Sequence, residues 1–308
     1  MTTAERRPAI DADLVARLVA AQFPAWASLP VRPVPAQGND NRTFRLGEVL
    51  VVRLPSAAGY VEAVEKEDRV LPALAGALPV AVPVPVATGV PGEGYPFPWS
   101  VRRWLPGVTV DADPALDRMS LARDLAAFLV AFQRLPADGG PAAGEHSFFR
   151  GTHPRVYDGE VRAALETLRR SRSGDDGLDV DACAAVWEEA LATDREGSPV
   201  WFHGDVGVGN LLTTGGRLSA VIDFGTCGVG DPACDLVIAW TCFDAAERRL
   251  FADAVGLPPP TWRLARAWAL WKALVTVTGP PPDTVVGRYH RGIQERAVRA
   301  VLADPVSG

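Results

Sequence analysis

Apolar residues in the first third of the chain change from a helical to a strand-like spacing. From Asp11 to Trp26, apolar side chains recur on one helical face, and Asp11 or Asp13 is a suitable N-cap. A second helix is predicted from Tyr60 to Leu74, with most of its charged residues facing outward. Short β-type runs separated by turn residues predict an antiparallel three-stranded meander followed by two more strands, at 31–34, 42–46, 49–54, 82–88 and 99–104.

After Leu105-Pro106-Gly107 the pattern becomes mainly helical. Helices are predicted at 121–135, 159–170, 180–192, 245–255, 261–277 and 285–302. A small β insertion interrupts them, with strands at 199–203, 210–213 and 218–222. We therefore predict an α+β fold with two lobes: a small antiparallel β-rich lobe with one main helix at 1–104, a hinge at about 102–107, and a larger, mostly α-helical lobe at 105–308.

Composition and charge exclude several classes of protein. The chain has 308 residues, 48% of them hydrophobic, and a net charge of −6 without any Lys/Arg-rich run, so no nucleic-acid or anionic-membrane partner is expected. No apolar run reaches the ~18 residues of a membrane helix, and the N-terminus lacks a signal peptide, which predicts a cytoplasmic protein. The four cysteines lack C-x-x-C spacing, which favours buried free thiols.

The segment from His203 to Asp235 contains the residue types that phosphoryl transfer requires. One carboxylate must orient an acceptor hydroxyl and take its proton, while a second carboxylate and an amide hold the Mg²⁺ that bridges the phosphates. Asp205 follows a predicted strand, Asn210 stands five residues later, and Asp223 ends the predicted hairpin. Hard oxygen ligands of this kind suit Mg²⁺.

His-Gly-Asp at 203–205 with Asn210, Asp-Phe-Gly at 223–225 and Gly-Asp-Pro-x-x-Asp at 230–235 resemble the aminoglycoside phosphotransferase family, which has the protein-kinase-like fold. The resemblance implies Asp205 as catalytic base, Asn210 and Asp223 as Mg²⁺ ligands, and ATP or GTP as phosphate donor. His203 and Asp235 are expected to support the loop by packing and hydrogen bonding. The Gly-Asp-Pro-x-x-Asp sequence is typical of this family and argues against a eukaryotic-type protein kinase.

The same resemblance predicts the nucleotide-binding residues. Arg53 stands where the third strand of the kinase fold carries a lysine, and Glu67 is its predicted partner, with Glu65 as the alternative. Arginine keeps the charge but not the geometry of lysine. The adenine base is expected to meet the carbonyl of Arg103 and the N–H of Leu105. The turn over the phosphates is expected to consist of Gly38, Asn39, Asp40 and Asn41.

The expected acceptor is a small molecule with a hydroxyl group, and the negative net charge favours a cationic one. It is an aminoglycoside-like antibiotic, or a metabolite such as an amino alcohol, a sugar or a macrolide. Acidic residues between Asp158 and Asp194 either receive a polycation or form an ordinary charged helix surface. Tryptophans at 240, 262, 268 and 271 either wall a pocket or fill the core. Arg53 also motivates an alternative, a nucleotide-binding regulatory protein without turnover.

Overall fold

The computed structural model describes residues 8–35, 40–170 and 178–304, which form two compact units. The first comprises the described residues up to Gly107 together with Ala220–Gly225, and the second comprises Val108–Ser219 and the residues from Thr226 onward. The sequence-based division assigns 220–225 to the second lobe. Its place in the first unit follows from long-range hydrogen bonding, because the Val221 N–H donates to the Ala81 carbonyl at 3.0 Å.

A five-stranded antiparallel sheet forms the centre of the first unit, in the order β1-β2-β3-β5-β4. The predicted meander is therefore confirmed. Its third strand places Arg53 opposite Thr43 on one side and Ser100 on the other. The strands are β1 (Val31–Pro33), β2 (Asn41–Leu46), β3 (Leu50–Pro55), β4 (Pro85–Gly89) and β5 (Trp99–Arg103).

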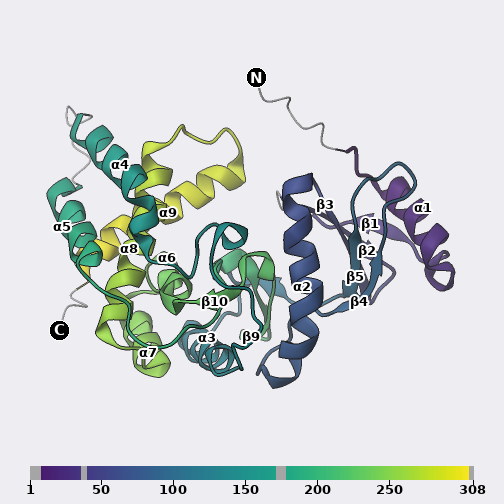
Figure 1. Ribbon diagram of the computed structural model, residues 1–308, viewed down its shortest axis with the longest axis horizontal. Coiled ribbons are helices and arrows are strands. Elements are labelled where there is room, and N and C mark those ends of the chain that lie inside the picture. Colours follow the sequence, from purple (N-terminus) through teal and green to yellow (C-terminus); the bar gives the residue numbers. More distant parts are fainter. Residues whose placement is uncertain (1–7, 36–39, 171–177, 305–308) are drawn as a thin grey trace. The chain divides into compact units, whose positions relative to one another are not determined.

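Two helices cover opposite faces of this sheet (Figure 1). Helix α1 (Ala12–Gln22) begins at Asp11, whose side chain accepts from the Leu14 N–H, and its apolar face packs on the sheet around Trp99. Helix α2 (Val61–Leu74) covers the other face. The prediction that Lys66 faces outward is wrong: it is buried, beside the buried Glu67. The α2 side of the sheet therefore contains charged groups, while the apolar core lies on the α1 side.

Helix α8 is the central element of the second unit, and most of its residues are buried, including Trp262 and Trp268. It packs against α4, α5 and α9, while α3 packs against α7. The predicted helices are confirmed, and α6 adds a short one. The helices are α3 (Arg118–Gln133), α4 (Asp158–Arg170), α5 (Val180–Leu191), α6 (Ile238–Thr241), α7 (Ala245–Val255), α8 (Pro259–Thr278) and α9 (Val285–Ala303).

Short strands of the second unit hold the loops that follow them. Strand β7 (Val200–Phe202) pairs antiparallel with β10 (Gly228–Gly230). Strands β6 (Val108–Thr109), β8 (Leu211–Thr214) and β9 (Arg217–Val221) form a second sheet, and the last two residues of β9 belong to the first unit. The sequence did not predict β6 and β10, because two or three residues are too few to show a strand periodicity.

No helix within the described ranges is long and apolar enough to cross a membrane. The four cysteines are free thiols; Cys183, Cys227 and Cys234 are buried and Cys242 is half-buried, close to the sequence prediction.

Candidate active site

The side chain of Asp235 holds the loop that follows β7. Its buried carboxylate accepts the His203 N–H at 2.8 Å and the Gly204 N–H at 2.6 Å. Burial is the main influence on this carboxyl group and raises the pKa of Asp235. Two backbone N–H groups ending on one buried acceptor fix the course of the chain directly before Asp205, which confirms the predicted supporting role of Asp235.

Gly204 lets the chain turn sharply before Asp205. Its φ is +85°, and a Cβ at this position would lie 2.8 Å from the Thr226 hydroxyl, so any other residue is strained here. The Thr226 hydroxyl donates to the His203 carbonyl at 2.8 Å, and the His203 Nδ1 accepts the Asp205 N–H at 3.2 Å. The buried His203 ring thus holds the loop together, while its predicted hydrogen bonding near the Asp-Phe-Gly backbone stays a prediction.

Asp205 carries a half-exposed carboxylate with two side-chain partners. The Asn210 Nδ2 donates to the Asp205 Oδ2 at 3.0 Å and to its backbone carbonyl at 2.9 Å. The Lys272 Nζ lies 3.5 Å from the Asp205 Oδ1, and each of these two side chains is 43% exposed. Desolvation is the largest influence and by itself raises the pKa of Asp205, but Lys272, His203 and Arg150 together outweigh it and hold the pKa below its ordinary value. The carboxylate is therefore ionised at neutral pH and accessible.

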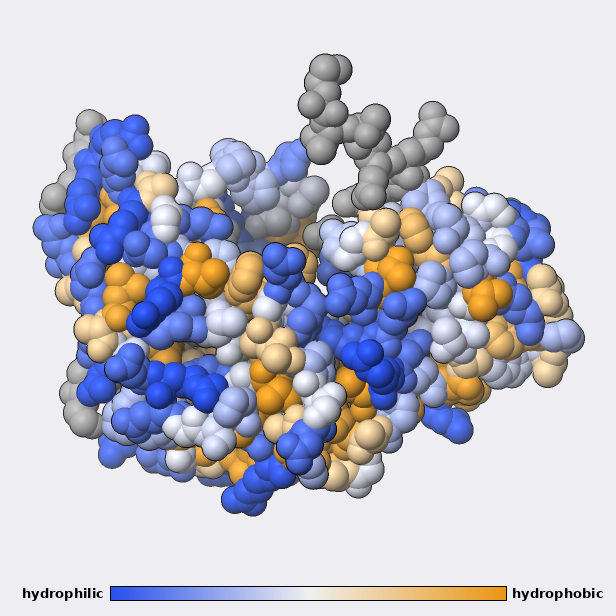
Figure 2. Space-filling view, in the orientation of Figure 1, coloured by the Kyte–Doolittle hydropathy of each residue, from blue (hydrophilic) through white to orange (hydrophobic). Residues whose placement is uncertain are grey.

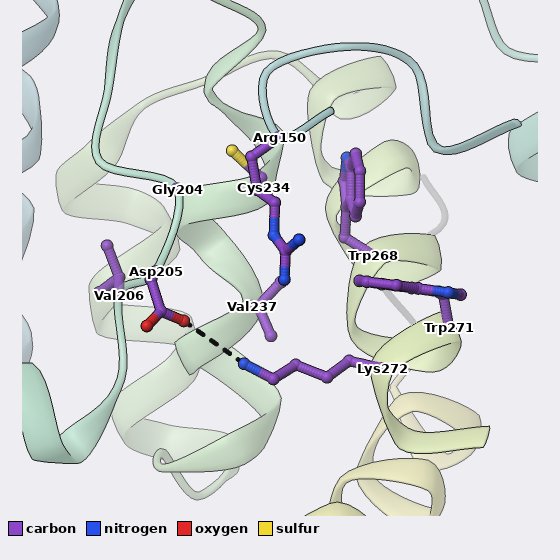
Figure 3. A pocket seen from close by; sticks show the side chains of 9 residues that line it. All are labelled: Arg150, Gly204, Asp205, Val206, Cys234, Val237, Trp268, Trp271 and Lys272. Atoms are coloured by element: carbon purple, nitrogen blue, oxygen red, sulfur yellow. Dashed lines mark hydrogen bonds and ion pairs between the residues drawn. The ribbon is translucent and has the colours of Figure 1, made fainter. Parts of the chain in front are cut away.

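Asp205 opens onto a recess that lies entirely within the second unit (Figure 3). The guanidinium of Arg150 and the ammonium of Lys272 project into the space beside the Asp205 carboxylate, and Trp268 and Trp271 stand on the other side. Sequence analysis gave no role here to either cation. Lys272 is 67 residues from Asp205 in the chain, and no local motif marks such a pair.

In the first unit, Glu67 is the centre of a buried ionic cluster. The Arg53 Nη1 lies 3.1 and 2.9 Å from the two Glu67 oxygens, and the Arg102 Nη2 lies 3.1 Å from Oε2. The Phe224 N–H also donates to the Glu67 Oε1 at 2.7 Å. Burial by itself raises the pKa of Glu67, but Arg102 and Arg53 outweigh it and hold the pKa below its ordinary value. Glu67, rather than Glu65, is thus the side chain that contacts Arg53.

Arg53 also reaches Asp223 within the same unit. Its Nη2 donates to the Asp223 Oδ1 at 3.1 Å. Asp223 has a φ of +66°, an uncommon conformation for a residue with a side chain, and such strain is often found where a side chain must be aimed at a ligand. Its side chain is 46% exposed. The Asp-Phe-Gly sequence therefore forms a strained turn held by Glu67 and Arg53.

The side chains of Asn210 in the second unit and Asp223 in the first each carry an oxygen of the kind that binds magnesium. Asn210 uses its Nδ2 as a donor toward Asp205, so its oxygen is the end that can accept a cation. Asp223 adds a half-exposed carboxylate. Among the described residues no group of three or more His, Cys, Asp or Glu could hold a metal ion.

Among the other residues predicted to bind nucleotide, the structure describes Asp40, Asn41, Arg103 and Leu105. Gly38 and Asn39 lie outside the described residues. The Asp40 carbonyl accepts the Ser56 N–H at 2.8 Å, and Asn41 begins β2 as a buried residue. Arg103 ends β5 and is exposed, and Leu105 follows it, half-buried. Their contacts with a nucleotide stay predictions.

A model of the phosphotransferase enzyme family matches residues 31–273, which is most of the chain. The chain belongs to this family. The family expected from the three motifs is therefore confirmed, and the protein is a phosphotransferase. No curated protein matches this phosphotransferase in a sequence comparison.

Solved structures share the fold of this phosphotransferase. The GDP complex of wild-type aminoglycoside 2'-phosphotransferase-IIIa is 18% identical, with 94% of this chain and 99% of that chain covered and a TM-score of 0.69. The gentamicin complex of APH(2")-IIa is 17% identical, with 97% and 98% covered and a TM-score of 0.62. Macrolide 2'-phosphotransferase MphH from Brachybacterium faecium is 24% identical, with 95% and 98% covered and a TM-score of 0.59. These likenesses confirm the predicted kinase-like fold.

Proposed function

We propose that this phosphotransferase transfers the γ-phosphate of ATP or GTP to a hydroxyl group of a small molecule, with Asp205 as the general base. The observation that carries the proposal is the setting of Asp205: an ionised, accessible carboxylate on a loop that Asp235 and His203 hold rigidly. A base must be fixed within hydrogen-bond distance of the proton it takes. The comparisons add that structures of this fold have been solved with GDP, ATP or ADP.

In this proposal the oxygen of the acceptor hydroxyl attacks the γ-phosphorus, and Asp205 accepts the proton of that hydroxyl. The new bond joins the acceptor oxygen to the γ-phosphorus, and the bond from that phosphorus to the β–γ bridging oxygen breaks, so a nucleoside diphosphate leaves. Asn210 holds the Asp205 carboxylate from one side with its amide, at 3.0 Å. The second oxygen of Asp205, beside Lys272, faces the recess where the acceptor would lie.

The donor side of the proposal rests on Arg53, Glu67 and Asp223. Glu67 orients the guanidinium of Arg53 with two hydrogen bonds, as a glutamate orients the lysine of the kinase fold. A guanidinium is a competent phosphate ligand because its N–H groups form a fork. Asn210 and Asp223 would hold magnesium, which when bound offsets the negative charge of the phosphates.

The acceptor is less narrowly defined by these contacts. The sequence favours an aminoglycoside-like antibiotic or a related metabolite, with an amino alcohol, a sugar or a macrolide as alternatives. Structures of the same fold contain kanamycin or gentamicin, and others are macrolide 2'-phosphotransferases. These structures are 17 to 24% identical to this chain, so their compounds serve here as a choice of acceptors to test.

One observation favours a second function, nucleotide binding without turnover. Arg53 contacts the Asp223 Oδ1 at 3.1 Å, and so a guanidinium occupies an oxygen that the proposal assigns to magnesium. If this contact persists when the nucleotide binds, the metal is excluded and the protein acts as a regulatory binding protein.

Release of nucleoside diphosphate, measured with a coupled assay over a panel of hydroxyl compounds with ATP and with GTP, tests the proposal. Asp205→Asn should lower kcat by about 10²- to 10⁴-fold, the usual contribution of a general base. Asp253→Asn is the matched control, since Asp253 is an exposed carboxylate on α7. Wild-type turnover in Asp205→Asn would contradict the role of this residue. Nucleotide binding without turnover on any acceptor would favour the regulatory alternative.

A further inference from the structure

We infer that the acceptor of this enzyme carries an anionic group, a carboxylate or a phosphate, near the hydroxyl that is phosphorylated, and that Lys272 and Arg150 bind this group. The inference rests on the proposed function, because it assigns the recess in front of Asp205 to the acceptor. It excludes a polycationic aminoglycoside as the natural substrate.

The charges that line the recess carry this inference. Three charged side chains line it: one carboxylate, Asp205, and two cations, Lys272 and Arg150. Figure 3 shows both cationic groups projecting into the same space beside the Asp205 carboxylate. Among these three lining groups, one cation balances Asp205 and the second leaves a net positive charge. A ligand with several ammonium groups would be repelled here, whereas a single anionic group would complete the balance.

Aromatic rings lie beside Arg150, and Lys272 follows one of them in the chain. The guanidinium carbon of Arg150 lies 5.1 Å from the centre of the Trp271 ring, which stacks on Tyr157 with 3.9 Å between ring centres. The Trp271 indole N–H donates to the Glu160 Oε2 at 2.9 Å, so this ring is fixed from both sides. Lys272 is the next residue on the buried helix α8. The Arg150 Nη1 also donates to the Phe148 carbonyl at 3.3 Å, and the remaining N–H groups of a guanidinium beside an aromatic ring bind a carboxylate or a phosphate well.

Several carboxylates of the acidic region that was a candidate site for a polycation are paired with arginines where the structure describes it. Figure 2 shows many hydrophilic residues over α4 and α5. In that region Arg162 bridges Asp158 and Glu188, at 2.8 and 3.0 Å. The remaining pairs are Arg169 with Asp181, Arg170 with Glu166, and Arg263 with Glu189. These paired carboxylates form an ordinary charged helix surface, which favours that alternative over a site for a polycation.

The anionic group takes no part in the bond changes. The acceptor hydroxyl gives its proton to Asp205, its oxygen bonds to the γ-phosphorus, and the nucleoside diphosphate leaves with the electrons of the broken bond. Lys272 and Arg150 bind the anionic group in the substrate and in the product alike. Their contribution is to position the hydroxyl beside Asp205, so they are specificity-determining residues rather than bases.

The first test compares acceptors that share a hydroxyl skeleton but differ in charge. Glycerate, glycerol 3-phosphate, glycerol and 3-aminopropane-1,2-diol form one series; gluconate, glucose 6-phosphate, glucose and glucosamine form another, and kanamycin is the polycation. The anionic members should have kcat/KM values at least about tenfold above the neutral ones, and the cationic members should be the poorest. The carboxylate and phosphate members separate the two kinds of anion. A preference for glucosamine or kanamycin would overturn the inference.

The second test changes Lys272 and reads a ratio. In Lys272→Met the ratio of kcat/KM for anionic over neutral acceptors should fall about 10- to 100-fold, the loss of one charge-assisted hydrogen bond. Any general effect on Asp205 cancels in this ratio. Lys272→Arg should keep the preference, and Arg299→Met, an exposed charge on α9, is the control for net charge. An unchanged ratio in Lys272→Met would refute the role of Lys272, and Arg150→Met should lower the ratio in the same direction.

Calorimetric titration with gluconate and glucose 6-phosphate separates failure of this inference from failure of the proposed function. If no compound is phosphorylated, binding of either anion that Lys272→Met abolishes still supports the anionic recess while the kinase proposal fails. If compounds are phosphorylated by an Asp205-dependent reaction without any preference for anions, the kinase proposal stands and the inference fails. If neither anion binds and none is phosphorylated, the inference fails as well.

Discussion

Replacing Glu67 with glutamine is the sharpest test of the cluster that organises the first unit. Glutamine keeps the size of the side chain and an acceptor for the Phe224 N–H, but removes the charge opposite Arg53 and Arg102. The side chains of these arginines are 13% and 0% exposed, so water cannot replace the lost carboxylate.

Removing one member of a buried ion pair costs about 3–5 kcal/mol. Both arginines keep a second carboxylate, Asp223 at 3.1 Å for Arg53 and Asp68 at 2.8 Å for Arg102. This partial compensation places the expected loss at the lower end, about 3 kcal/mol. Urea unfolding followed by circular dichroism and tryptophan fluorescence measures it by linear extrapolation.

Glu65→Gln is the matched control, since Glu65 lies on the same helix but is exposed. Its change should stay within about 0.5 kcal/mol. A loss below about 1 kcal/mol in Glu67→Gln, or equal losses in both variants, would refute the reasoning from buried charge.

The pH dependence of the free energy of unfolding tests the charge of Glu67 in a second way. Because the folded-state pKa of Glu67 lies below its unfolded value, its charge stabilises the folded state fully above the unfolded pKa of about 4.3. The contribution is lost as the pH falls through the folded-state pKa. The difference in unfolding free energy between the wild type and Glu67→Gln should therefore be constant near neutral pH and shrink below about pH 4. A difference that grows on acidification would contradict the assignment.

Two further predictions concern the other contacts of the site. Arg53→Lys should keep nucleotide-dependent turnover within about tenfold, because the charge beside Glu67 remains. The free energy of unfolding should fall by about 1 kcal/mol, because lysine loses one of the two carboxylates that Arg53 contacts. Turnover kinetics and urea unfolding measure the two effects, and a collapse of activity would show that the geometry requires a guanidinium. Gly204→Ala should lower the free energy of unfolding by about 1–3 kcal/mol, since the φ of Gly204 is +85° and the added Cβ approaches Thr226. The control is the same unfolding experiment on Gly207→Ala, where an added Cβ meets no atom within 4 Å.

Local patterns were sufficient for the elements and for the supporting residues close to a motif. The cap at Asp11, the meander around β3 and the anchoring by Asp235 follow from spacing and from side-chain chemistry that act over a few residues or within a known motif. The family was predictable for the same reason, because its three motifs lie within one short segment. The lobe boundary, the cytoplasmic location and the roles of the nucleotide-binding residues stay predictions.

Long-range charge pairing is what the sequence did not reveal. Arg102 and Lys66 look like ordinary surface cations in a helical or strand pattern, yet both are buried. Lys272 belongs to none of the sequence motifs, yet it lies beside Asp205. Residues 220–225 join the first unit through bonds to Ala81 and Glu67, which no local periodicity encodes. Such pairs depend on the packing of distant elements, so they appear only in three dimensions.

The position of the recess on α8 has a consequence for how acceptor preference can change during evolution. Trp268, Trp271 and Lys272 belong to the same helix whose other residues fill the interior of the second unit. Mutations that reshape this wall therefore also disturb packing and will be tolerated only in a variant with stability to spare. Arg150 lies outside regular secondary structure, on a turn, where substitutions are tolerated more readily. Laboratory selection for new acceptors should accordingly yield changes at position 150 before changes in the helix.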